Sequence, residues 1–190
     1  MKRQLLNGLL MVVFSMSALA EPAQWQTAAS AEYKLLWKRL TYTELQIKSD
    51  QLDTVPDDIL STDYAKRIVI QYGVGVSAER FRDMTRDSLD DAFSKQELAP
   101  YNRQIEEFCG WFDAVEKDDR YSLTWEPNQG LTLARNASPV GVVKDADAAA
   151  IILSVWLGRA AISESQRDDM LAQWRQFIQS HQVSASKLLR

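Results

Sequence analysis

The sequence has few of the residues on which most metal, redox and nucleophilic sites depend. Its 190 residues include one histidine and one cysteine. His181 has no Cys, Asp or Glu at metal-ligand spacing beside it, so neither a zinc site nor His-assisted catalysis is expected. Cys109 has no partner for an internal disulfide, and its apolar neighbours favour burial. We therefore expect no metal ion and no cofactor, and we assign no catalytic residue.

Glycine is also scarce, with seven in the chain. Residues 73–75 (GVG) lack the third glycine and the parallel strand–helix–strand context of a dinucleotide site, so we interpret them as a turn. The carboxylates occur as adjacent pairs, which on a helix point in different directions and are typical of a solvated surface. The longest apolar stretch beyond the N-terminal region, residues 146–157, has the length of a core helix and is too short to cross a bilayer.

The N-terminal region has the pattern of a secretory signal peptide. Lys2 and Arg3 precede an uncharged stretch, residues 5–19, that ends on Ala18-Leu19-Ala20. This order of positive, apolar and small residues predicts cleavage after Ala20 and export to the periplasm. The alternative is an N-terminal anchor that stays uncleaved. The remaining residues, 21–190, have the length of a single domain.

The charge balance bears on the partners that the protein could bind. The formal net charge is −4, and it becomes −6 once Lys2 and Arg3 are removed (−4 − 2). Such an acidic, mixed surface argues against nucleic acid and against anionic membranes. We also expect no stable membrane insertion after the signal peptide is cleaved. The composition does not identify any protein partner.

Alternation of side chains predicts most of the strands. Residues 33–37, 40–47 and 65–72 are rich in aromatic and β-branched side chains. Residues 121–125 and 131–135 alternate around the turn 127–130 and predict a hairpin, and a short strand follows at 140–143. Residues 21–31 are expected to be a loose lead-in. Residues 48–64 are expected to be a loop, with a short edge strand or turn as the alternative.

Helical periodicity and capping residues predict four helices. They span residues 78–95 after an N-cap at Ser77, residues 100–115, residues 146–157 up to Gly158, and a last helix opened by a capping box at residues 163–166. Strands and helices occur in separate runs. This order predicts an α+β fold with an antiparallel sheet and helices packed on one face.

Six tryptophans are many for a chain of this length. Most of them fall within predicted strands or helices. One interpretation is a large aromatic core. The other is that some of these rings line a cleft between sheet and helices, where an apolar ligand could lie.

The hairpin at residues 121–133 (YSLTWEPNQGLTL) resembles that of the bacterial, exported chalcone isomerase-like proteins. The resemblance continues through Asn136-Ala137, the strand at 140–143 (VGVV) and the helix end at 154–158 (SVWLG). Upstream, residues 38–45 (KRLTYTEL) and 67–72 (RIVIQY) are similar to two strands of that family. The resemblance covers about residues 32–175 and implies an open-faced β-sandwich, in which helices cover one face of an antiparallel sheet.

The resemblance also implies where a ligand would lie. Of the residues that plant chalcone isomerases use, only the threonine is matched, by Thr41. Arg80 and Asp87 stand at the tyrosine and asparagine positions, and Lys34 is the cation nearest to the arginine position. A non-catalytic protein is therefore implied, with a small amphipathic or fatty-acid-like ligand in the sheet–helix cleft near Lys34, Trp37 and Thr41. Two alternatives remain open: a structural or interaction protein whose cleft is filled, and an isomerase of unknown substrate.

Overall fold

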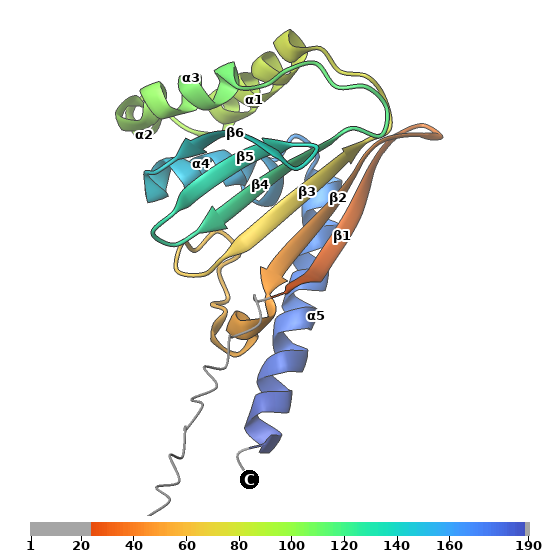
Figure 1. Cartoon of the computed structure of the whole chain (residues 1–190), viewed down its shortest axis with the longest axis vertical. Coiled ribbons are helices and arrows are strands. Elements are labelled where there is room, and N and C mark those ends of the chain that lie inside the picture. Colours follow the sequence, from red (N-terminus) through yellow and green to blue (C-terminus); the bar gives the residue numbers. More distant parts are fainter. Residues whose placement is uncertain (1–23, 189–190) are drawn as a thin grey trace, which may run out of the picture.

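The computed structural model describes residues 24–188, with side chains up to Gln182, so the predicted signal peptide lies outside the described residues. Six antiparallel strands form one sheet in sequence order (Figure 1). The strands are β1 (Trp25–Leu35), β2 (Lys38–Lys48), β3 (Lys66–Tyr72), β4 (Arg120–Glu126), β5 (Gly130–Arg135) and β6 (Ser138–Val143). The helices are α1 (Ala78–Ala92), α2 (Lys95–Leu98), α3 (Asn102–Gly110), α4 (Ala146–Leu157) and α5 (Glu164–Leu188), with short 3-10 helices η1 (Ser49–Thr54) and η2 (Ala99–Tyr101).

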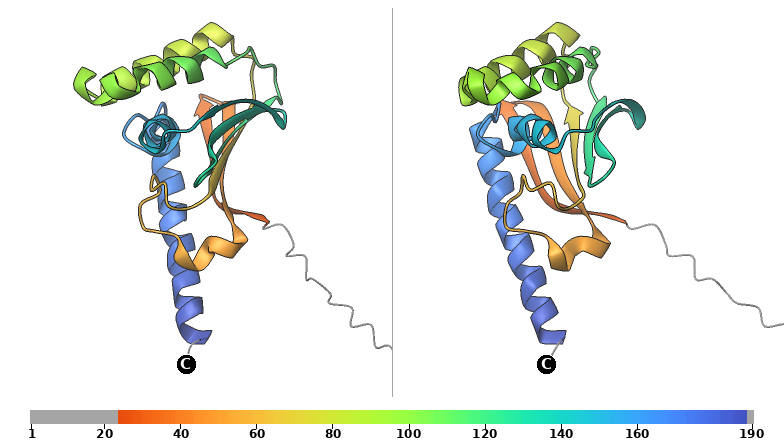
Figure 2. Two further views of the ribbon diagram at one scale, coloured as in Figure 1. Left: turned by 60° about the vertical axis from the view of Figure 1, so that its left-hand side comes forward. Right: turned by 90° about the vertical axis from the view of Figure 1, so that its left-hand side faces the viewer.

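The helices lie on one side of the sheet (Figure 2). Successive side chains of a strand point to opposite faces, and the burial of β2 and β3 follows this period of two. Thr43, Leu45 and Ile47 of β2 are buried beneath the helices, whereas Glu44 and Gln46 lie on the open face. The predicted α+β class, an open-faced sandwich with an antiparallel sheet, is confirmed.

The expectation of a loose lead-in at residues 21–31 is wrong from Trp25 onward, because β1 begins there. Small and polar residues are typical of a loose segment, but in the fold the small ones let α5 pack closely on this edge strand. Ala29 and Ala31 are buried there. The side-chain amide of Gln173 on α5 bonds to both the backbone N–H and the carbonyl of Ser30, at 3.0 and 2.7 Å. The helix thus satisfies backbone groups that an edge strand leaves unpaired.

Three other predicted segments also need correction. Residues 33–37 do not form one strand, because the chain turns at Leu36 and Trp37 between β1 and β2. The predicted helix at 100–115 ends at Gly110. Beyond it Val115 pairs with Val76 in an isolated antiparallel bridge, which draws the chain back towards the sheet. Residues 48–64, predicted as a loop, contain η1.

Aromatic rings pack between helix α1, the segment that follows α3, and the adjoining ends of β3 and β4. The ring of Phe81 stacks on Phe112 at 5.1 Å and meets Tyr72 and Tyr121 edge-on at 5.2 and 5.8 Å. Ser77 accepts a hydrogen bond from the Arg80 amide and caps α1 as predicted, which fixes the start of the helix that carries Phe81. Cys109 is buried, as the sequence indicated.

Candidate functional site

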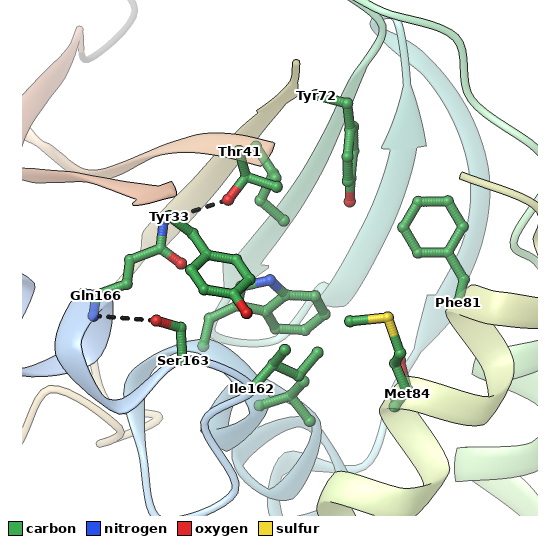
Figure 3. Close-up of a pocket in the computed structure, with 12 residues that line it drawn as sticks. Tyr33, Thr41, Tyr72, Phe81, Met84, Ile162, Ser163 and Gln166 are labelled. Carbon is green, nitrogen blue, oxygen red and sulfur yellow. Dashed lines mark hydrogen bonds between the residues drawn. The ribbon is translucent and has the colours of Figure 1, made fainter. Parts of the chain in front are cut away.

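A pocket lies between the sheet and helices α1, α4 and α5 (Figure 3). It holds about 70 Å³ of free volume. The strands contribute one wall, α1 and α4 the opposite one, and the start of α5 closes the side. The lining residues are Tyr33, Thr41, Ile70, Tyr72, Phe81, Met84, Thr85, Val155, Trp156, Ile162, Ser163 and Gln166.

Gln166 organises the polar side of the pocket. Its Nε2 donates to the carbonyl of Ala31 at 3.2 Å, to Oγ1 of Thr43 at 3.1 Å and, more weakly, to Oγ1 of Thr41 at 3.4 Å. Its backbone N–H donates to Oγ of Ser163 at 3.3 Å, which is one half of the predicted capping box. The other half is not formed, because the Gln166 side chain reaches to the sheet instead. The first turn of α5 is thereby tied to β1 and β2.

Two tyrosine hydroxyls at the pocket have no hydrogen-bond partner in the part of the chain that the structure describes. Both Tyr33 and Tyr72 point towards the cavity (Figure 3), and neither hydroxyl forms a hydrogen bond to any residue that the structure describes. Burial raises the pKa of Tyr72 far above its ordinary value, since a phenolate would lose its hydration there. The Tyr72 hydroxyl therefore stays protonated and is free to donate to a ligand.

The lining carries no charged side chain within the described residues. Hydroxyl groups and one amide supply its polarity, and aromatic and aliphatic side chains supply the remainder. A charged headgroup would lose its hydration here without gaining an opposite charge, which is costly. This arrangement therefore suits an amphipathic ligand whose polar end is neutral and forms hydrogen bonds.

Of the predicted ligand-binding residues, the structure places Thr41 in the lining. Lys34 and Trp37 lie outside it, beyond Tyr33 on the β1–β2 hairpin, and their part in ligand binding stays a prediction. Arg80 and Asp87 are exposed on α1 and also lie outside the lining.

Sequence reasoning missed Tyr72, Met84 and Gln166. The sequence indicates Tyr72 and Met84 only as members of a strand and a helix. The capping-box pattern found Gln166, but that pattern describes a helix start and carries no signal for a pocket.

The described residues show no sign of metal or thiol chemistry. No group of three or more His, Cys, Asp or Glu side chains in residues 24–188 is placed to hold a metal ion. Burial raises the pKa of the Cys109 thiol to about 11, which suppresses the reactive thiolate. No helix in this part of the chain has both the length and the apolar character needed to cross a membrane.

Comparison with known proteins identifies the family. Residues 31–172, more than half of the chain, match the model of the chalcone isomerase-like family. The fold is similar to the crystal structure of a fatty-acid binding protein from Arabidopsis thaliana, with a TM-score of 0.60 and 16% sequence identity over 88% of this chain and 98% of that one. No curated protein sequence matches the chain. The chain belongs to the chalcone isomerase-like family.

Proposed function

We propose that this protein is exported to the periplasm and binds a small amphipathic molecule, such as a fatty acid in its neutral form, without chemical conversion. The observation that carries the proposal is the Tyr72 hydroxyl, which has no hydrogen-bond partner among the described residues and faces a largely apolar, uncharged pocket. Buried polar groups are normally hydrogen-bonded, so a hydroxyl left free in a pocket is suited to a ligand. The fatty-acid binding function of the similar Arabidopsis protein agrees with this ligand class. The export proposal rests on residues 1–20 of the sequence.

The size of the pocket restricts how a ligand would fit. Its free volume of about 70 Å³ is well below the ~300 Å³ of ordinary ligand pockets. An alkyl chain would therefore have to displace lining side chains. Met84 is suited to move, because methionine is unbranched and adapts to irregular spaces. We expect the polar end of the ligand to bind at Tyr72 and Thr41 and its chain to extend past Met84.

The small volume also favours a second candidate, a structural or interaction protein whose cleft is filled by its own side chains. Trp156 and Phe81 both occupy space in the lining. The two candidates differ in one measurable respect: only the binding protein gains ligand affinity when the pocket is enlarged and loses it when the free hydroxyl is removed.

Isothermal titration calorimetry with fatty acids of increasing chain length tests this difference. We expect Tyr72→Phe and Thr41→Val each to weaken binding about five- to tenfold, the effect of one hydrogen bond. Met84→Ala should strengthen the binding of longer chains. Tyr42→Phe and Thr132→Val remove the same groups from the open face of the sheet and should leave affinity unchanged. Binding that Tyr72→Phe does not alter, or no binding even to Met84→Ala, would contradict the proposal and favour the filled cleft.

A further inference from the structure

The tip of the β1–β2 hairpin exposes three consecutive large apolar side chains. Leu35, Leu36 and Trp37 are 61%, 81% and 89% exposed. The hairpin projects away from the body of the domain (Figure 1). Within residues 24–188, none of the three belongs to the hydrophobic core or packs against it. Burial within the domain therefore does not account for these side chains.

The backbone conformation at the tip is also unfavourable for the residue that adopts it. Leu36 has a φ of 57°, in the left-handed region. Glycine or asparagine adopts that conformation at lower cost, and both are common in two-residue hairpin turns. A bulky aliphatic residue at this position makes the turn less favourable, so its side chain is better explained by a contact outside the domain.

Cations surround the apolar tip on both strands. Lys34 precedes it, and Lys38 and Arg39 follow it. Glu32 pairs with Lys34 and, at 3.2 Å, with Arg39, so two of these three cations share one carboxylate. Lys38 forms no ion pair with any described residue. The hairpin thus has a positive excess on a chain whose net charge is −4.

We propose that this tip, residues 34–39, docks the protein on the surface of an anionic lipid bilayer. Tryptophan prefers the boundary between headgroups and acyl chains, and leucine side chains gain by leaving water for that region. Lysine and arginine next to them keep their charged ends at the level of the lipid phosphates, which attract them. Apolar side chains at the apex with cations directly behind them match the layering of a bilayer surface.

This proposal revises the expectation drawn from net charge. The overall charge argued against anionic membranes, but it averages over a surface whose cations and apolar residues meet at one end. The docking proposed is peripheral and requires no membrane-crossing helix.

The hairpin also adjoins the pocket. Tyr33 and Thr41 are paired across β1 and β2, and both line the pocket, while the tip continues the same two strands. A domain docked through the tip would hold its pocket close to the bilayer, where amphipathic molecules partition. The docking proposal does not rest on the proposed ligand, because vesicle binding and ligand binding are measured separately.

Vesicle sedimentation tests the docking. The full-length gene is expressed in an exporting host, and mass spectrometry establishes that all variants share one N-terminus. Vesicles of phosphatidylglycerol with phosphatidylethanolamine are compared with vesicles of phosphatidylcholine. The test variant carries Leu36→Asn with Trp37→Ser, and asparagine suits the left-handed position. The matched control carries Val140→Ser with Val142→Ser on β6, where each valine is 40% exposed.

We expect the wild type to bind the anionic vesicles, the test variant to bind at least tenfold more weakly, and the control to match the wild type. Added salt should weaken binding. Brominated lipids should quench part of the tryptophan fluorescence of the wild type, and this quenched part should be missing in Trp37→Phe. Such quenching reports the insertion of Trp37 itself. A wild type that stays in the supernatant, equal binding by the test variant, or no quenching of Trp37 would overturn the proposal. Loss of a copurifying protein in the test variant, without vesicle binding by the wild type, would assign the tip to a protein interface.

Discussion

The side-chain amide of Gln166 donates a 3.1 Å hydrogen bond to the hydroxyl of Thr43, joining the first turn of α5 to the middle of β2. Both residues are buried, with exposed fractions of 8% and 1%. The same amide reaches the carbonyl of Ala31 on the neighbouring strand. One side chain therefore fixes the start of α5 against two strands and shapes the polar wall of the pocket.

Replacing Gln166 with leucine should lower the free energy of unfolding by about 1–3 kcal/mol. The substitution keeps a similar volume but leaves the buried Thr43 hydroxyl and Ala31 carbonyl without this donor, and unmade buried hydrogen bonds cost about that much. Urea unfolding gives the value. Gln176→Leu changes the same residue type at an exposed position of α5 and should cost little. Equal losses in the two variants would show that the Gln166 hydrogen bonds do not stabilise the fold.

Lys66 should make stability depend on pH. Its ammonium group is buried, 2.7 Å from the carbonyl of Ile59 and 4.0 Å from the ring centre of Tyr64. Burial lowers its pKa to about 7, although Asp58 and Asp63 oppose the shift. An unfolded lysine stays protonated up to about pH 10. Between these values the unfolded chain binds more protons than the folded one, so the free energy of unfolding should rise with pH.

Urea unfolding at several values from about pH 7 to about pH 9.5 measures this slope, which for one group is at most ~1.4 kcal/mol per pH unit. Lys66→Met should abolish the rise. Lys117→Met, at an exposed site, should keep it. A flat profile in the wild type would show that Lys66 stays charged throughout, held by the carbonyls of Ile59 and Ser61.

Ala137→Gly should stabilise the protein by about 1 kcal/mol. Asn136 and Ala137 form the turn between β5 and β6 with φ values of 47° and 70°, and alanine is strained in that region whereas glycine is not. Thermal unfolding measures the gain. Ala114→Gly, also exposed but without a positive φ, should instead lose about 0.5–1 kcal/mol through the greater freedom of the unfolded chain. A loss at both positions would mean that the turn carries no such strain.

The sequence predicted the fold where local patterns and tertiary packing agree. The caps at Ser77 and Gly158 and the alternation in β3 were predicted correctly. The residues that determine capping and burial in these elements are close together in the sequence. The first half of β1 escaped prediction because it is stabilised by α5, which lies far along the chain. The turn at Leu36 and Trp37 escaped because its residues are apolar, against the usual composition of turns.

The site was predictable only in part. Resemblance to the family led to Thr41, which lines the pocket. Lys34 and Trp37 are near Thr41 in sequence, but a strand advances ~3.3 Å per residue, so nearby positions on a hairpin can lie well away from a pocket. Gln166 and Tyr72 belong to the site because of long-range contacts, which no local sequence pattern indicates.

Native mass spectrometry of the protein purified gently from an exporting host, followed by denaturing extraction, tests the central claim most directly. The claim is that the pocket lined by Gln166 and Tyr72 holds a small amphipathic molecule. It predicts a second mass above that of the bare chain, released on denaturation, and a smaller bound fraction for Tyr72→Phe with Thr41→Val. A bare-chain mass alone, unchanged after incubation with excess fatty acid, would contradict the claim.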